Sequence, residues 1–412
     1  MSDNKIPPKT KERYIILDAL RGFALFGICL ANYSEFSLYS FQSSEIIAAM
    51  PTAGIDKIVR YLQYIFIDGK FYTIFSILFG IGFSIILSNA EKNNRNGLKI
   101  FYRRMVILFF IGLFHLVFLW AGDILILYAF AGFFLPLFRN LSNRKLLIWS
   151  LALLLIPVVI DGIIILSGIN PAVPVIHVTQ HFHRLVGIND HNFPVWLAEK
   201  QTYADIVRFN LGGSFIRMQE FIEGNRFFKV FGLFLFGLYI GRNKLYAKLE
   251  HYKTQLKKIY LPLLVIIGLP YTFLYAWSAM NGQPLGLVIH SLLYAFSVVP
   301  LSLAYITVFC LLYLKWKEGR FFTLMAYPGR MALTNYIMQS VFGILIFYGV
   351  GFGLGASTGL VYVELIALGI FIFQIVYSKL WLRYFNFGPL EWIWRILTYG
   401  KWIKLKNKHG LY

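Results

Sequence analysis

Apolar residues recur along the chain in long runs that shorter polar segments separate. Most of these runs approach the roughly 20 residues that a helix needs to cross a bilayer. None shows the alternation of apolar and polar positions that marks a strand of a membrane barrel. The pattern predicts ten transmembrane helices, at residues 15–32, 70–90, 105–120, 124–138, 146–168, 228–241, 259–279, 287–314, 331–350 and 359–378. We therefore expect an all-α, polytopic integral membrane protein.

Lysine and arginine are distributed unevenly between the two sides that alternate crossing defines. With the N-terminus in the cytoplasm, the cytoplasmic segments are 1–14, 91–104, 139–145, 242–258, 315–330 and 379–412. They carry 29 Lys and Arg residues, whereas the connections on the other side carry 3. Cytoplasmic loops of membrane proteins are enriched in these two residues. The asymmetry predicts that both termini are cytoplasmic.

The composition supports a membrane location. Of 412 residues, 58% are hydrophobic and 14% are charged, against roughly 25% charged in an average soluble protein. The net charge of +20 is also typical of nucleic-acid-binding proteins. Because Lys and Arg lie mainly on one side of the predicted membrane protein, most of this positive charge is explained without nucleic acid. The expected partner is therefore the lipid bilayer. Cys29 and Cys310 lie in apolar runs, and we interpret them as small core residues rather than a disulfide.

The chain is predicted to form a single membrane domain over residues 1–412. It comprises a cytoplasmic tail (1–14), a helical bundle (15–378) and a cytoplasmic interfacial helix with a basic tail (379–412). Glu391 and Arg395 are four residues apart among three Trp residues, which favours a helix lying at the interface.

Ionisable residues inside apolar runs are costly, so each is a candidate for function. Asp18 and Arg21 are three apart on one helical face and are predicted to form a structural ion pair. They also argue against a cleaved signal peptide, although cleavage near Ala31 stays open as an alternative. Asn32, near the far end of the same run, would either bind a polar substrate or link helices.

The run around His115 carries the second candidate. His115 lies about 18 Å along a helix from Arg103, at mid-depth of the membrane. Asp123 sits in a turn between two short runs, so the turn is predicted to be recessed below the surface. An imidazole oriented by a carboxylate is the arrangement of a general base. The alternative is a core histidine bonded to a neighbouring helix; Tyr128, just beyond, is a candidate substrate-binding residue.

Arginines begin two helices at the predicted cytoplasmic face. Arg103, Arg104 and Arg330 are candidates for binding the phosphates of a cofactor, because guanidinium groups bind phosphate through paired hydrogen bonds. Adjacent residues point about 100° apart on a helix, so only one of Arg103 and Arg104 is expected to face the bundle. The alternative is that these arginines act only as topology signals.

Two further groups of polar residues are candidates for binding. Asn335 and Gln339 are four apart on one face of a span; they are candidate substrate-binding residues, with interhelical hydrogen bonding as the alternative. His177, His181, His183 and His191 form a histidine-rich segment. Spacing of four suits two metal ligands, but Pro171 and Pro174 and the absence of a completing Cys or acidic residue favour a polar outer loop without metal.

Five blocks of the sequence resemble the YeiB-like bacterial membrane proteins of unknown function. They are LDALRGFALFGICLANY, GKFYTIFSILFGIGFS, RRMVILFFIGLFHLVFLWAGDILILYAFAG, GRMALTNYIMQS and GPLEWIWRILTYG, in order between residues 17 and 400. The resemblance therefore covers nearly the whole chain. It implies a multi-pass protein of the bacterial cytoplasmic membrane.

The opening block is also similar, more distantly, to transmembrane acyltransferases such as heparan-alpha-glucosaminide N-acetyltransferase and enzymes that O-acetylate surface glycans. That resemblance implies acyl-CoA as a cytoplasmic co-substrate and a cell-envelope glycan or lipid as the acceptor. Asn32 falls where the glucosaminide enzyme has an asparagine. The histidine that follows in that enzyme has no counterpart in residues 33–57, so His115 with Asp123 is the expected replacement. The alternative function is a small-solute or proton-coupled transporter.

Overall fold

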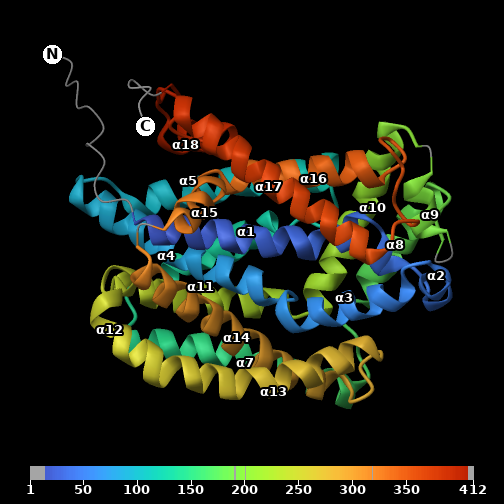
Figure 1. The fold of residues 1–412 in the computed structure, drawn as a ribbon, viewed down its shortest axis with the longest axis horizontal. Coiled ribbons are helices and arrows are strands. Elements are labelled where there is room, and N and C mark those ends of the chain that lie inside the picture. Colours follow the sequence, from blue (N-terminus) through green and yellow to red (C-terminus); the bar gives the residue numbers. More distant parts are fainter. Residues whose placement is uncertain (1–13, 190–191, 200, 318, 407–412) are drawn as a thin grey trace.

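The computed structural model describes residues 14–189, 192–199, 201–317 and 319–406. These residues form helices and connecting turns, and the only β-type pairing among them is an isolated bridge between Phe385 and Lys406. The all-α prediction is confirmed for this part of the chain. The axes of most of the long helices are roughly parallel (Figure 1).

Eighteen α-helices are formed by the described residues. The first nine are α1 (Ile15–Phe36), α2 (Ser44–Ala49), α3 (Ala53–Phe66), α4 (Lys70–Lys92), α5 (Gly97–Phe118), α6 (Leu125–Phe134), α7 (Asn143–Ser167), α8 (Val173–Leu185) and α9 (Phe193–Ala198). The others are α10 (Tyr203–Glu223), α11 (Arg226–Arg242), α12 (Leu249–Gln255), α13 (Leu261–Met280), α14 (Leu287–Lys315), α15 (Arg320–Arg330), α16 (Ala332–Phe347), α17 (Leu360–Tyr384) and α18 (Pro389–Tyr399).

Helices α1, α4 and α11 form the middle of the molecule (Figure 1). Helix α1 packs against α4 on one side and against α15, α16 and α17 on the other. Helix α11 lies between α4 and α7, and α14 contacts both α7 and α13. This arrangement surrounds α1 with protein along most of its length.

Glycines allow α1 to approach α15 closely. A Cβ atom on Gly22 would lie 1.8 Å from the carbonyl oxygen of Met325, and one on Gly329 would lie 1.9 Å from that of Asp18. Real Cβ atoms do not come so near a backbone oxygen, so only glycine fits at either position. The contact fixes α1 beside the helix that ends at Arg330.

Within the described part of the chain, seven helical segments are long and apolar enough to cross a membrane, judged by length and composition. They are α1, Ala53–Lys92 (α3 with α4), α5, α7, Leu249–Met280 (α12 with α13), α14 and α17. Helices α15 and α16 pass the same test together but are bent by 77°. These segments support a multi-pass membrane protein, whereas the count of ten spans and the orientation of the termini stay predictions.

Three of the ten predicted spans correspond to helices shorter than the roughly 20 residues of a typical crossing, namely α6, α11 and the 16-residue α16. Helix α6 has 10 residues and continues only to Phe138 as a 3-10 turn. Helix α11 has 17 residues, and its apolar side chains pack mainly against other helices. Apolar runs therefore mark core helices here as well as membrane spans.

The predicted outer connections contain helices that the apolar pattern did not reveal. Helices α2, α8 and α9 gather at one end of the molecule, opposite the end where α12 and α18 lie (Figure 1). Helix α10 begins with a capping box, in which Thr202 and Asp205 satisfy each other's backbone N–H groups. The loop expected around His177, His181 and His183 is wrong, because these residues belong to α8.

Candidate functional site

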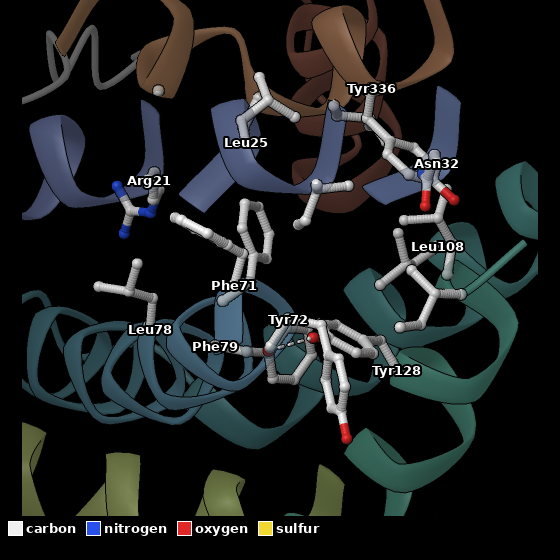
Figure 2. A pocket seen from close by; sticks show the side chains of 18 of the residues that line it. Arg21, Leu25, Asn32, Phe71, Tyr72, Leu78, Phe79, Leu108, Tyr128 and Tyr336 are labelled. Atoms are coloured by element: carbon white, nitrogen blue, oxygen red, sulfur yellow. Dashed lines mark hydrogen bonds between the residues drawn. The ribbon is translucent and has the colours of Figure 1, made fainter. Parts of the chain in front are cut away.

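A cavity of about 380 Å³ runs beside α1 through the interior of the molecule. Residues of α1, α4, α5, α6, α10, α11, α15, α16 and α18 line it. Its middle is apolar, with Leu25, Phe71, Leu78, Phe79 and Leu108 among the lining residues, and both ends are polar. Arg21 and Asn32 project from α1 at opposite ends of this space (Figure 2). From Asp18 to Glu35 the helix spans about 25 Å, at about 1.5 Å per residue.

Four arginines line the end where α1 begins: Arg21, Arg104, Arg330 and Arg395. Asp18 accepts a hydrogen bond from Arg21 at 2.7 Å, so the predicted ion pair is present. The guanidinium of Arg104 stacks on the ring of Trp394, 3.9 Å from its centroid. We call this group the arginine cluster. Guanidinium groups gathered at one end of a cavity form a site suited to phosphate.

Of the adjacent pair Arg103 and Arg104, only Arg104 lines the cavity. Arg103 is exposed and donates a hydrogen bond of 2.8 Å to the carbonyl oxygen of Leu397. That carbonyl belongs to the last turn of α18, where the backbone oxygens lack helical partners. Arg103 therefore caps the end of α18 and lies outside the cavity, and its role in binding a cofactor stays a prediction.

Helix α18 closes the cavity beside the arginine cluster. Glu391 accepts hydrogen bonds from the backbone N–H groups of Leu333 (2.7 Å) and Thr334 (3.0 Å) and from the Thr334 hydroxyl (2.6 Å). It therefore caps the start of α16, directly after the 77° bend. Burial raises the pKa of Glu391, and the hydrogen bonds from Thr334 oppose that rise. Sequence spacing suggested Arg395 as its neighbour but could not reveal this capping role.

Asn32 and Glu35 line the opposite end of the cavity, one turn apart on α1. Neither side chain makes a hydrogen bond or ion pair with the described residues. Arg217 and Arg226 line the same end, and both act electrostatically on Glu35, as do Glu220 and Arg60. We call Asn32, Glu35, Arg217 and Arg226 the distal cluster. It combines hydrogen-bonding groups that have no protein partner with fixed positive charge.

Arg217 holds the recessed turn in place. Its guanidinium donates to the carbonyl oxygens of Gly122 (2.8 Å) and Asp123 (2.9 Å) and to the carboxylate of Glu220 (2.5 Å). Arg217 and Glu220 are three residues apart on α10, and this spacing lets them form the ion pair. The turn that carries Asp123 is therefore tied to the distal cluster.

His115 and Asp123 contact each other but do not line the cavity. Nδ1 of His115 lies 2.8 Å from Oδ2 of Asp123, and Nε2 lies 2.7 Å from Oγ of Ser340. Oδ1 of Asp123 accepts from the N–H of Ile126, which fixes the start of α6. All three side chains are buried. Both ring nitrogens thus have protein partners, which is the arrangement of a structural histidine; the role of His115 as base stays a prediction.

The remaining predicted substrate-binding residues differ in position. Tyr128 lines the cavity, and its hydroxyl hydrogen-bonds to Ser76 at 2.7 Å. Asn335 and Gln339 are buried away from it and donate to Ser378 (2.9 Å) and Gln374 (3.0 Å) on α17. The two amides link α16 to α17, so the interhelical alternative fits their geometry.

The histidine-rich segment assembles no metal site in the described part of the chain. The ring of His183 stacks with those of Phe193 and Phe209. His191 lies outside the described residues.

Sequence reasoning missed Glu35, because the first predicted span ended at residue 32. Tyr33, Ser34 and Glu35 interrupt the apolar run, yet α1 continues to Phe36. The spacing of three between Asn32 and Glu35 was the available signal, since it places both on one helical face.

Comparison with known proteins gives relatives along the whole chain. A family model described as a protein of unknown function (DUF418) matches residues 240–401. The uncharacterized protein YxaH of Bacillus subtilis (strain 168) is 31% identical over 409 residues, which cover 98% of each chain. An uncharacterized 39.9 kDa protein encoded in the amylase 3' region of Bacillus acidopullulyticus is 27% identical, over 96% of each chain. YeiB of Escherichia coli (strain K12) is 25% identical, over 94% of this chain and 96% of its own. No solved structure matches.

Proposed function

The chain belongs to the YeiB-like family of unknown function, and from this premise we propose that it transfers an acyl group across a membrane. The donor is a cytoplasmic acyl-CoA, and the acceptor is a hydroxyl or amine of a cell-envelope glycan or lipid on the outer side. The membrane is the bacterial cytoplasmic membrane. The arginine cluster faces the cytoplasm in this proposal, in line with the positive-inside distribution of Lys and Arg.

The observation that carries the proposal is the division of one cavity into three parts. Arg104 and its neighbours offer several guanidinium groups to the phosphates of CoA at one end. The apolar middle, which includes Phe79 and Leu108, lies where the extended pantetheine arm would join the phosphates to the thioester. Asn32 and the distal cluster supply polar groups where the acyl group would meet its acceptor.

The residues near the reaction have roles that follow from their positions relative to the cavity. The amide of Asn32 is available to donate to the thioester carbonyl oxygen, where negative charge develops during acyl transfer. His115 and Asp123 act by positioning the turn that Arg217 holds, since His115 does not reach the cavity surface.

Titration of acetyl-CoA into the purified protein by calorimetry tests the proposal. Arg104→Lys is expected to weaken binding about tenfold, because an ammonium cannot make the paired contacts of a guanidinium. Arg103→Lys is the matched control, since the neighbouring residue has the same charge but lies outside the cavity. Absence of binding to the unmodified protein, or equal affinity in both variants, contradicts the proposal.

One observation favours a proton-coupled transporter as the second candidate. Asp161 is buried between helices, where it accepts hydrogen bonds from Asn225 and Ser291, and Lys229 is buried nearby against Tyr294. Buried ionisable residues within membranes often serve proton relays. A transporter of small solutes would not bind acetyl-CoA, so the same titration separates the two functions.

A further inference from the structure

Four carboxyl groups line the cavity: those of Asp18, Glu35, Asp68 and Glu391. Asp18 pairs with Arg21, Asp68 accepts a hydrogen bond of 2.6 Å from Tyr275, and Glu391 caps α16. Glu35 alone among these four makes no side-chain hydrogen bond or ion pair within the described residues. No histidine lines the cavity in the described part of the chain. Among the described residues, Glu35 is therefore the one carboxylate of the cavity wall whose side chain has no hydrogen-bond or ion-pair partner in the protein.

The surroundings of Glu35 suit a group that accepts and releases a proton. The positive charges of Arg217, Arg226 and Arg60 act on the Glu35 carboxyl group, and the carboxylate of Glu220 opposes them. Arg217 is itself held by the backbone of the recessed turn and by Glu220, so its position does not depend on Glu35. Arg226 stacks on Tyr72, 5.1 Å from the ring centroid. Both arginines are thus fixed by other contacts and leave the Glu35 oxygens to a ligand.

Asn32 stands one helical turn before Glu35 and faces the same cavity. A general base must lie within hydrogen-bond reach of the proton that it removes, and the carbonyl under attack needs a donor close by. An amide and a carboxylate at positions i and i+3 of one rigid helix supply both groups side by side. Helix α1 is packed between α4 and the α15–α17 group, so their spacing is held firmly.

We propose that Glu35 is the general base of the acyl transfer, an inference that rests on the proposed function. The Glu35 carboxylate removes the proton from the acceptor's O–H or N–H group as the acceptor's lone pair attacks the thioester carbonyl carbon. The new C–O or C–N bond forms and the C–S bond breaks. The CoA thiolate then takes the proton from the Glu35 carboxyl group, which regenerates the carboxylate. No oxidant or further reactant is needed.

The test uses the full chain in lipid nanodiscs with acetyl-CoA as donor. Release of CoA is followed with a thiol reagent, first with water as the only acceptor and then with glucosamine as a hydroxyl and amine probe. The variants are Glu35→Gln, Glu35→Asp and Glu364→Gln. Glu364 is the matched control, since it is a partly buried glutamate that accepts from Gln63 and does not line the cavity. Calorimetry gives the affinity of each variant for acetyl-CoA.

Glu35→Gln is expected to lower the rate of CoA release at least about 100-fold while acetyl-CoA affinity changes less than about twofold. Glu35→Asp keeps a carboxylate and should recover part of the rate, and Glu364→Gln should behave like the unmodified protein. A carboxylate base works in its ionised form, so the unmodified rate rises with pH as Glu35 loses its proton. That rise should be absent in Glu35→Gln and present in Glu35→Asp.

The outcomes separate this inference from the proposed function. Unmodified protein that does not bind acetyl-CoA removes the proposed function and the inference together. Binding with an unchanged rate in Glu35→Gln overturns the inference alone. Binding without CoA release to either water or glucosamine also overturns it, because a base poised at the thioester activates water as well. Retained acetyl-CoA binding in Glu35→Gln shows that the variant has folded.

Discussion

His115 and Asp123 form a buried pair in which Nδ1 of the imidazole lies 2.8 Å from Oδ2 of the carboxylate, and neither residue lines the cavity. The second ring nitrogen of His115 is bonded to Ser340 on α16. The pair therefore joins α5, the recessed turn and α16. Its geometry is that of a structural link between three elements.

His115→Ala is expected to destabilise the protein, because it leaves the Asp123 carboxylate and the Ser340 hydroxyl buried without this partner. Breaking a buried pair typically costs about 3–5 kcal/mol. Thermal unfolding of the purified protein in detergent measures the loss as a lower Tm. A variant with unchanged Tm but without acyl transfer would instead support His115 as the base.

Gly22→Ala should disrupt the contact between α1 and α15. The added Cβ would lie 1.8 Å from the carbonyl oxygen of Met325, so the two helices must move apart. Overpacking of this kind costs about 1–3 kcal/mol. Gly54→Ala is the control, since a Cβ there meets nothing within 4 Å. Equal Tm values for the two variants would show that the close approach is not maintained.

Glu391 is expected to make stability depend on pH. Burial raises its pKa, so the unfolded chain loses this proton at a lower pH than the folded protein does. The stabilisation from this group is complete below the ordinary carboxyl pKa and falls as pH rises toward the raised pKa. Glu391→Gln keeps an oxygen for the Leu333 and Thr334 N–H groups but does not titrate. Tm measured between about pH 4 and 8 should fall less with pH in this variant, and parallel curves would contradict the assignment.

The charge asymmetry predicts the orientation of the chain. Reporter fusions after Leu249 and after Tyr412 should give a cytoplasmic signal, and a fusion within 176–192 should give an outside signal. An outside signal at Tyr412 would contradict both the ten-span topology and the orientation on which the proposed function depends.

Local spacing predicted the contacts that lie within one helix or one turn. The Asp18–Arg21 ion pair follows from a spacing of three, and His115 with Asp123 follows from a short turn between two helices. Sequence geometry also required Arg103 and Arg104 to diverge, but it could not decide which of them faces inward. That choice depends on α18, which lies about 290 residues away along the chain and holds Arg103 through Leu397.

Contacts between distant helices could not be predicted from spacing. The partners of Glu391 and Gln339 belong to other helices, and no local pattern marks them. Glu35 was not predicted to lie in a helix of the bundle for a different reason. Polar residues end an apolar run on a hydropathy scale, so the predicted span stopped before Glu35. The helix itself continues, because a polar side chain that faces a polar cavity does not contact lipid. Helices α2, α8 and α9 of the outer connections were missed because each is shorter than a membrane span.

The proposed function requires that the cavity beside α1 holds the pantetheine arm of an acyl-CoA. Photocrosslinking with an acetyl-CoA analogue that carries a diazirine on this arm, followed by mass spectrometry, tests this directly. Crosslinks are expected at the apolar cavity walls, at Leu78, Phe79 and Leu108, and excess acetyl-CoA should suppress them. Crosslinks confined to side chains on the outer surface, such as Leu166 (89% exposed) and Ile266 (70% exposed), would contradict it.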